Sequence, residues 1–531
     1  MKHAFKSVLF VAASVNIAAS SPKNSQLIYG ETTTPKGFDP YTNHEQAAQR
    51  LSELIFDSLV DISESGEILP SLAERWNIEE QGSSVTFELR KDVHWHNASA
   101  PEKKGEAFTA QDVVTTVKLI TNPQSDIPNR ERFAAIKSAT AVNDSTVKIM
   151  LNRAMGNPMK VLSFKIIPHE AFASANAIKR DAKEFIQHPI GTGAFQFKQA
   201  NEEGEVLLTS NPNYFKGEPK LKEIVMKTYL DQSVMAQSLM YSALDMVPYV
   251  SPKDLPEIAG DKNLGVIPYE ALSYSFFAIN TQRGILKDKK VRQALNYSIN
   301  RPEMLKAFFS GKGKLISGPF PPTSWAYNLE VKPYDFNTDK AKELLREAGL
   351  SQSKDGKFLD SNGTPVVLTL AIPLAGESET IKRIALAFQN YLADVGLSTD
   401  LAFMDWNVWK EKVLGKHDYD LTLASWAFDD SSNIMSLFHS SSAMPWGNNF
   451  VQFKNPLVDS LLSEAAFTND AEKKRVIYRK LHAVLADESP YVFLWTLQHH
   501  AAHNAALQNV QIDPYYFFNR ISSWEKKVQH D

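Results

Sequence analysis

The sequence predicts an α/β fold divided into about three domains. The chain has 531 residues, and a typical domain size of about 150 residues gives roughly three domains. Its 43% hydrophobic and 22% charged residues are typical of a folded globular protein. Helical and strand patterns alternate late in the chain, which favours an α/β arrangement there.

Three segments show the alternation of apolar and polar residues that predicts a half-buried strand. Each contains three apolar residues spaced two apart, so their side chains share one face of the strand. The three sets are Val85, Phe87 and Leu89; Val147, Ile149 and Leu151; and Val366, Leu368 and Leu370.

Four segments show helical spacing. The first begins at Thr109, which lies three residues before Asp112 and just ahead of Val113 and Val117, a capping-box pattern. The second is expected to end at Gly349, because glycine often terminates helices. The apolar faces of the later three helices are Ala341, Leu344, Leu345 and Ala348; Val458, Leu461, Leu462 and Ala465; and Ile477, Leu481, Val484 and Leu485.

The first twenty residues have the composition of a secretory signal peptide. Lys2 and Lys6 precede a short apolar run at residues 8–13, and small residues suited to cleavage follow at 18–20. The run is too short to span a membrane as a helix. A first apolar strand and a signal anchor are the alternatives. We expect residues 1–20 to be a cleaved signal peptide.

Composition favours the periplasm for the mature protein. The chain contains no cysteine, so it forms no disulfide and has no acceptor for a lipid anchor. A free exported protein stays with the cell only where an outer membrane retains it. The net charge of −4 argues against nucleic acid as a partner. We expect a periplasmic monomer that is not a lipoprotein and has no stable membrane insertion.

Eight motifs resemble those of a known family. Residues 69–117 contain P-x-LAE-x-W, F-x-LRK-x-V-x-WH and FTA-x-DV in that order. They are similar to the opening block of the family 5 extracellular solute-binding proteins, the receptors of oligopeptide and dipeptide ABC importers. Residues 97–106 depart from that block and are expected to form a surface insertion. The other seven motifs lie at residues 30–40, 189–197, 211–217, 288–301, 319–322, 341–349 and 487–491.

The resemblance implies a two-lobed clamshell of the class II, cluster C type with a discontinuous first domain. The chain is expected to cross between the lobes near residues 280–283 and 495–500, where two strands form a hinge. The expected divisions are a signal peptide at 1–20; domain I at 21–57, 184–280 and 497–531; an inserted domain II at 58–183; and domain III, the second lobe, at 281–496.

The resemblance also places the ligand chemistry at residues 406–438. Trp406, Trp426 and Phe428 supply apolar walls, and Asp429–Asp430 supplies negative charge. In peptide receptors of this family a carboxylate after a strand that ends near such a tryptophan meets the peptide α-ammonium. An ammonium group that leaves water needs a charged partner. We therefore expect the acidic pair to bind the peptide amine.

The choice between the two carboxylates stays open. Counting forward from Trp426 selects Asp429, whereas counting back from the downstream SLFHSSS segment selects Asp430. The alternative is that the pair is a solvated turn that caps a helix beginning near Ser431.

Extended main chain is expected to hold the peptide backbone. Candidate edges are residues 32–34, which include Thr33 and Thr34, and the segment that begins at Asn448. Such pairing reads the backbone and ignores side chains, which suits broad specificity. Tyr274 is a further candidate for the cleft lining, with core packing as its alternative.

The sequence predicts no catalytic residue, metal site or cofactor. It has no GxSxG elbow, P-loop or HExxH motif. His94 and His96 share strand spacing, and His499, His500 and His503 cluster, but no carboxylate or third ligand is evidently paired with them. Gly191-Thr192-Gly193 is too short for a dinucleotide motif, and its glycines are expected to serve a positive φ.

The predicted function is capture of short peptides by lobe closure and delivery to an inner-membrane ABC permease with its ATPase subunits. Within the same family the alternative ligands are a nickel complex, haem, glutathione, an opine or a sugar. A periplasmic hydrolase and a sensory or scaffold protein are alternatives from other classes.

Overall fold

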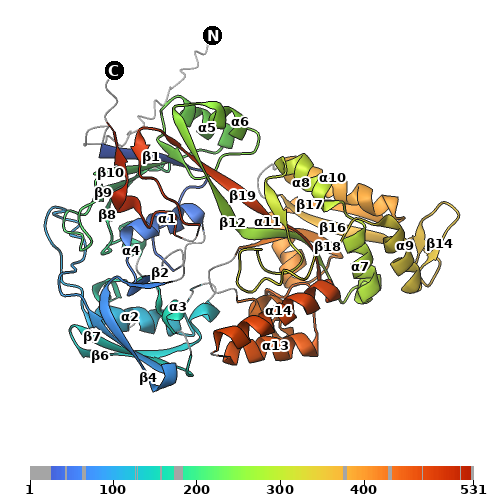
Figure 1. The fold of residues 1–531 in the computed structure, drawn as a ribbon, viewed down its shortest axis with the longest axis horizontal. Helices are drawn as coiled ribbons and strands as arrows, with labels where there is room; N and C mark the ends of the chain where they lie inside the picture. Colours follow the sequence, from blue (N-terminus) through green and yellow to red (C-terminus); the bar gives the residue numbers. More distant parts are fainter. Residues whose placement is uncertain are drawn as a thin grey trace, which may run out of the picture.

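One large sheet runs through the molecule (Figure 1). The computed structural model describes residues 25–41, 45–62, 67–125, 127, 130–155, 158–172, 183–374, 379–427, 433–468, 470–514 and 516–527. Within these residues the strand order is β17-β16-β18-β12-β19-β11-β1-β10-β9-β8, and β13 also pairs with β19. The strands are β1 (Gln26–Glu31), β8 (Phe195–Ala200), β9 (Val206–Ser210), β10 (Glu223–Thr228), β11 (Met246–Val247), β12 (Leu264–Ile279), β13 (Gly313–Leu315), β16 (Val367–Leu374), β17 (Ser398–Asp405), β18 (Leu421–Ala427) and β19 (Tyr491–Asn504).

The long antiparallel strands β12 and β19 join two bodies (Figure 1). Tyr269 of β12 packs against the core of the first body, whereas Phe276 belongs to a core of the second. The pairing with β19 shifts register between Glu270 and Tyr274, an irregularity typical of a bend. Strand β12 therefore contributes to the cores of both bodies. The domain divisions themselves stay predictions.

The first body carries a second, four-stranded sheet covered by helix α2 (Ala110–Thr121). The capping box of Thr109 and Asp112 is present, and Val85 and Phe87 are buried, so both local predictions are confirmed. The inserted loop at 97–106 is largely exposed. The remaining elements of this body are β2 (Val60–Ile62), β3 (Ile68–Pro70), β4 (Ala73–Glu79), β5 (Ser84–Leu89), β6 (Ile136–Asn143), β7 (Thr146–Leu151), β20 (Leu507–Gln508), β21 (Glu525–Lys526), α1 (Gln46–Ile55), α3 (Met159–Leu162), α4 (Lys183–Gln187), α5 (Gln232–Met240) and α6 (Leu255–Gly260).

In the second body helices surround the parallel strands β16, β17 and β18 (Figure 1). Gly349 follows Ala348, the C-cap residue of α9, and has a φ of +85°, as its predicted role as a helix terminator requires. The predicted apolar faces of α9, α13 and α14 face the cores. The elements are β14 (Ser351–Gln352), β15 (Phe358–Leu359), α7 (Lys289–Tyr297), α8 (Arg301–Phe309), α9 (Thr338–Glu347), α10 (Glu379–Asp394), α11 (Trp406–Trp409), α12 (Met435–Phe438), α13 (Pro456–Phe467) and α14 (Ala471–Glu488).

The glycines at 191 and 193 are required by a close approach of two backbones. A Cβ on Gly191 would lie 1.8 Å from the carbonyl oxygen of Ile55, and one on Gly193 would lie 2.4 Å from that of Leu54. The predicted reason, a positive φ, is wrong, because neither glycine is among the residues with positive φ. Glycine is required here because a residue without a Cβ lets two main-chain segments pack this closely.

Two further motifs meet on one buried carboxylate, Asp57. Tyr214 of the 211–217 turn donates its hydroxyl to Asp57 Oδ1 at 3.0 Å, and Thr192 donates to Oδ2 at 2.9 Å. Lys216 Nζ lies 3.8 Å from the same carboxylate. These motifs therefore hold the end of α1 against β8 and the turn before β10, and their role is structural.

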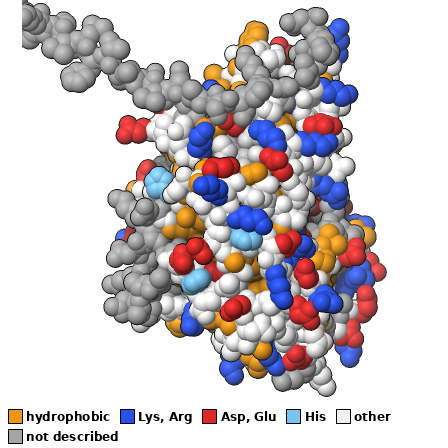
Figure 2. Space-filling model, turned by 90° about the vertical axis from the view of Figure 1, so that its left-hand side faces the viewer, with side chains coloured by type: hydrophobic (Ala, Val, Ile, Leu, Met, Phe, Trp, Pro, Cys, Tyr) orange, Lys and Arg blue, Asp and Glu red, His pale blue; other side chains and the backbone are white. Residues whose placement is uncertain are grey.

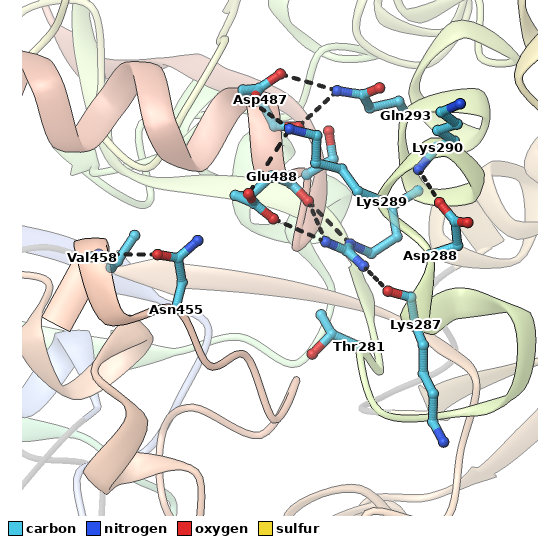
Figure 3. A network of polar contacts seen from close by, with 12 residues as sticks. Thr281, Lys287, Asp288, Lys289, Lys290, Gln293, Asn455, Val458, Asp487 and Glu488 are labelled. Atoms are coloured by element: carbon cyan, nitrogen blue, oxygen red, sulfur yellow. Dashed lines mark hydrogen bonds and ion pairs between the residues drawn. The ribbon is translucent and has the colours of Figure 1, made fainter. Parts of the chain in front are cut away.

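The helix motif at 288–301 and the closing motif at 487–491 bind each other (Figure 3). Lys289 Nζ lies 2.6 Å from Asp487 Oδ2, and Gln293 donates to the Asp487 carbonyl at 2.9 Å. The buried Arg292 donates to the carbonyl oxygens of Glu488, at 2.8 Å, and of Lys287, at 2.9 Å. These contacts fix the start of β19 relative to α7.

Replacing Arg292 with Met is expected to lower the free energy of unfolding by about 3 kcal/mol. The change leaves buried carbonyl oxygens without donors, and each such group costs about 1–3 kcal/mol. Urea unfolding followed by circular dichroism measures the loss. Lys290→Met, which breaks a neighbouring exposed ion pair with Glu347, is the control and should leave the midpoint unchanged. An equal midpoint for both variants would contradict the role given to Arg292.

The visible surface mixes charges of both signs. Figure 2 shows Lys and Arg side chains interleaved with Asp and Glu over the described part of one face of the first body. This distribution matches the small net charge and provides no broad basic surface there of the kind that nucleic acid requires. Among the described residues, none of the helices has the length and apolar composition of a membrane span.

Candidate functional site

A row of aromatic rings in the second body links two of the predicted site residues. Trp406, 44% exposed, stacks on Trp409 with ring centroids 4.9 Å apart. Trp409 lies 6.5 Å from Phe450, and Phe450 lies 5.7 Å from Trp426. Trp426 also donates its indole N–H to the hydroxyl of Tyr491 at 3.0 Å. The tertiary structure thus brings Trp406, Trp426 and the segment after Asn448 together.

This aromatic row lies at the carboxyl end of the parallel strands. Leu374 and Asp405 are register partners at the ends of β16 and β17, and β18 runs parallel to β16 and ends at Ala427. Ligands of open α/β sheets bind beyond such carboxyl ends. Phe428, Asp429 and Asp430, which follow β18 directly, lie outside the described residues, so their role stays a prediction.

Two predicted residues of the second body have internal partners. Tyr274 is 1% exposed, and its ring lies 5.5 Å from that of Phe276 and 6.0 Å from that of Phe493. This is the core packing named as its alternative. Asn448 is half-buried and donates to Ser436 Oγ at 3.3 Å. The predicted roles of Tyr274 and Asn448 in binding a ligand therefore stay predictions.

Thr33 and Thr34 are exposed at the carboxyl end of β1. Thr34 Oγ1 donates to Thr228 Oγ1 at 3.3 Å, and Thr228 donates in turn to the Gly204 carbonyl at 3.0 Å. Strand β1 is parallel to β10, so Thr34 and Thr228 lie beyond the same edge of the sheet. Both predicted threonines are accessible to a ligand at this edge.

A pocket of about 320 Å³ opens beside this edge. Its walls come from four separate segments of the first body and from both joining strands. The lining residues are Gly30, Glu31, Thr32, Gln46, Arg50, Gln232, Met235, Pro248, Tyr249, Tyr269 and His499.

A buried ion pair forms part of the pocket wall. Arg50 Nη1 donates to both carboxylate oxygens of Glu31, at 2.7 and 2.9 Å. Burial alone would lower the pKa of Arg50, but the neighbouring Glu31 and Tyr269 raise it above its ordinary value. The Arg50 guanidinium also lies 4.8 Å from the ring centroid of Phe517. Burial raises the pKa of Glu31 above its ordinary value, while the charge and hydrogen bonds of Arg50 oppose that rise. The two groups form a buried ion pair in which opposite charges face each other.

Aromatic side chains form the opposite wall. The ring of His499 lies 4.7 Å from that of Tyr249 and 5.5 Å from that of Tyr269. Tyr269 donates its hydroxyl to the Pro248 carbonyl at 2.8 Å. Burial, together with the nearby charge of Arg50, lowers the pKa of His499 to about 4, so the ring is neutral at neutral pH.

The sequence analysis missed most of this pocket. The sequence predicts Thr32 at a cleft edge and offers His499 only as a candidate metal ligand, and no local pattern marks Arg50 or Tyr249. Arg50 lies on a helix whose pattern predicts only an apolar face, and Tyr249 follows a strand of two residues. Their function depends on neighbours that are distant in sequence.

A buried serine and histidine pair resembles part of a hydrolase site but has the wrong hydrogen bonds for one. His482 Nε2 lies 2.9 Å from Ser317 Oγ, while His482 Nδ1 accepts the backbone N–H of Asn328 at 3.1 Å. The proton therefore resides on Nε2 and points at the serine, so this nitrogen cannot take the serine proton. His482 is 0% exposed, and the pair is structural.

The histidines considered as metal ligands have other partners. His96 Nε2 donates to the Gly193 carbonyl at 2.9 Å, and its Nδ1 accepts the backbone N–H of Gly191 at 3.2 Å. His503 Nδ1 contacts the Asn504 carbonyl at 2.9 Å. Across the described residues, no group of three His, Asp or Glu side chains has the arrangement of a metal site.

Comparison with known proteins identifies the family. The profile of the bacterial extracellular solute-binding proteins, family 5, middle region, matches residues 67–446. The dipeptide-binding protein of Escherichia coli strain K12 is 27% identical over 494 residues, 90% of each chain. Heme-binding protein A of Haemophilus influenzae is also 27% identical and covers 89% of this chain and 87% of that one.

Solved structures agree over nearly the whole chain. The oligopeptide-binding protein AppA of Bacillus subtilis, in complex with a nonapeptide, matches with a TM-score of 0.81 and 25% identity. The match covers 95% of this chain and 99% of that one. The predicted two-lobed α/β fold is thereby confirmed. These relatives are solute-binding proteins rather than enzymes. The chain belongs to family 5 of the bacterial extracellular solute-binding proteins.

Proposed function

We propose that this protein is a periplasmic receptor that captures short peptides and delivers them to an inner-membrane ABC permease. One observation carries the proposal: the exposed, stacked Trp406 lies at the carboxyl end of the parallel strands, and β18 of the same sheet is followed in sequence by Phe428 and then Asp429–Asp430. Stacked aromatic rings offer apolar area to many side chains, and an adjacent carboxylate suits an ammonium group.

Membership of the family supports a peptide ligand. Relatives named as dipeptide-binding and oligopeptide-binding proteins span most of the chain. The joining strands β12 and β19 are the hinge about which the two bodies close on the ligand. Burial of the ligand charge between the two bodies strengthens its contact with the acidic pair, because the local dielectric constant falls.

Replacing both Asp429 and Asp430 with Asn is expected to weaken tripeptide binding at least about 100-fold. Removal of one partner of a buried charge pair costs about 3–5 kcal/mol, and about 1.4 kcal/mol corresponds to a tenfold change in affinity. Isothermal titration calorimetry measures the affinities, and the two single variants decide which carboxylate meets the amine.

An N-acetylated tripeptide provides the matched control, since it lacks only the ammonium charge. It should bind the wild-type protein as weakly as the free peptide binds the double variant, and acetylation should have little further effect on that variant. Full peptide affinity in the double variant would overturn the amine contact. Native mass spectrometry of purified protein adds an independent test, because a retained haem or nickel complex would contradict a peptide ligand.

A further inference from the structure

An ion pair crosses the strands that join the two bodies. The ammonium group of Lys314, on β13, contacts the carboxylate of Glu270, on β12. Strand β13 lies along one edge of β19, where Lys314 is the register partner of Thr496. Strand β12 lies along the other edge, where Glu270 is the register partner of Gln498. The pair therefore reaches across β19 and links the strands on either side of it.

The two ends of this pair belong to different bodies. Tyr269, next to Glu270, packs against the core of the first body, whereas Leu315, next to Lys314, packs against a core of the second. The pairing of β12 with β19 is interrupted between them, because four residues of β12, from Glu270 to Tyr274, correspond to only two of β19. Extra residues in one strand bend a sheet. Motion of the bodies about this bend changes the separation of Glu270 and Lys314.

The Glu270 carboxylate depends on Lys314. Its side chain is only 28% exposed, and its Oε2 is buried without a hydrogen-bond partner. Within the described part of the chain, Lys314 is the cation that pairs with it. A carboxylate that has lost part of its hydration needs a facing positive charge. Lys314 itself is 55% exposed, so the pair remains accessible to salt.

The pair lies away from the pocket beside β1. Successive side chains of a strand point to opposite faces of the sheet. Tyr269 and His499 line the pocket, so Glu270 and Gln498, the next register pair, point to the opposite face. Any effect of the pair on ligand affinity must therefore act through the arrangement of the two bodies.

The two bodies also approach each other at a second place, below the joining strands in Figure 1. Helix α3 of the first body lies beside α14 of the second there. Burial lowers the pKa of Lys474, on α14, and the positive charges of Arg153 and Lys160 in the first body lower it further. The contact between Glu270 and Lys314 is thus made in an arrangement that brings the bodies together on this side as well.

We infer that Glu270 and Lys314 form an electrostatic latch at the hinge, which stabilises the arrangement in which the two bodies close on the ligand. Opening about the bend separates the two charges. The inference rests on the proposed function, because it assumes closure on a ligand. It gives two residues that lie outside the predicted ligand-binding segments a part in setting affinity.

Lys314→Met, which keeps the aliphatic chain and removes the charge, tests the latch. Trialanine titrated calorimetrically into the mature protein is expected to bind this variant about fivefold more weakly than wild type, a change that corresponds to about 1 kcal/mol. The deficit should shrink between about 0.05 and about 0.5 M salt, because a half-exposed pair is screened. Lys340→Met breaks an exposed pair with Glu343 inside α9 and should bind as wild type does.

Glu270→Gln separates the latch from any other role of Lys314. Glu270→Gln/Lys314→Met should bind trialanine with the affinity of Glu270→Gln alone, because the charge that Lys314 faces is already gone. Wild-type affinity in Lys314→Met would overturn the inference. So would an equal loss from Lys314→Met in the presence and absence of the Glu270 carboxylate.

Spin labels measure the separation of the bodies directly, since the chain contains no cysteine of its own. Lys137→Cys in β6 and Lys480→Cys in α14 place one label on each body at an exposed position. Double electron–electron resonance at a half-saturating trialanine concentration should show a smaller short-distance population in Lys314→Met than in wild type. Failure of trialanine to bind any variant would contradict the proposed function. The ligand-free distance distributions would then decide the inference, and identical distributions in wild type and Lys314→Met would overturn it.

Discussion

Arg50→Met should lower the free energy of unfolding at pH 7 by about 3 kcal/mol, because it leaves Glu31 buried without its partner. Removal of one member of a buried pair typically costs about 3–5 kcal/mol. Protonation of Glu31 limits that cost. Neutralising a carboxyl group of ordinary pKa 4.5 at pH 7 costs roughly 3.4 kcal/mol, at about 1.36 kcal/mol per pH unit.

The deficit of Arg50→Met is therefore expected to depend on pH. In the variant the folded-state pKa of Glu31 lies far above its unfolded value, so the folded state binds the extra proton. Stability is then lost as the pH rises above about 4.5. The difference from the wild-type protein should shrink to roughly 1 kcal/mol at pH 5. Urea unfolding at pH 5, 6 and 7 measures this dependence.

Two control variants separate the buried pair from a general loss of charge. Glu31→Gln/Arg50→Met should recover most of the stability, because no unpaired charge is left. Arg75→Met breaks the exposed pair between Arg75 and Glu88 and should have little effect at any pH. A deficit of Arg50→Met that does not change with pH would show that lost packing on Phe517, rather than the stranded Glu31, causes it.

Mild acid should destabilise the protein through its buried histidines, among them His96 and His482. Burial lowers the pKa values of His96 and His482 to about 4. In both rings Nδ1 accepts a backbone N–H, so a second ring proton would face a donor. The unfolded state binds protons first, near pH 6.5, and stability is lost as the pH falls from about 6.5 to 4. Between pH 7 and 5 each histidine contributes a loss of roughly 2 kcal/mol.

One carboxyl group acts in the opposite direction. Burial raises the pKa of Glu53 to about 7, so this group favours the folded state as the pH falls from 7 towards 4.5. The loss in the wild-type protein is therefore smaller than the histidines alone would give. A histidine variant isolates the contribution of one ring, because Glu53 is unchanged in it.

His482→Gln should reduce the loss between pH 7 and pH 5 by roughly 2 kcal/mol relative to the wild-type protein. Chemical denaturation at the two pH values gives the four free energies required. His188→Gln, at an exposed position, is the control and should follow the wild-type curve. The same slope in His482→Gln and wild type would show that the ring is protonated in the folded protein.

The sequence by itself determined the local elements and the family. Alternation at Val85 and Phe87 placed β5, and the capping box at Thr109 placed the start of α2. Such patterns are readable because burial of one face of a strand or helix depends on residues a few positions apart. The order of the motifs then indicated the two-lobed fold through the family resemblance. Several of those motifs make structural contacts inside one body, as Asp57 and Arg292 show.

Only the tertiary structure decided what lines the site of the first body. Glu31 and Arg50 belong to different elements, and His499 comes from the far end of the chain. Sheet order, which no local pattern encodes, places β1 near the joining strands. Burial then gives these residues their properties, because removal from water forces Arg50 to pair with Glu31 and keeps the His499 ring neutral. The charge state and pairing of such residues depend on burial, so they can be assigned only when the residues packed around them in the folded chain are known.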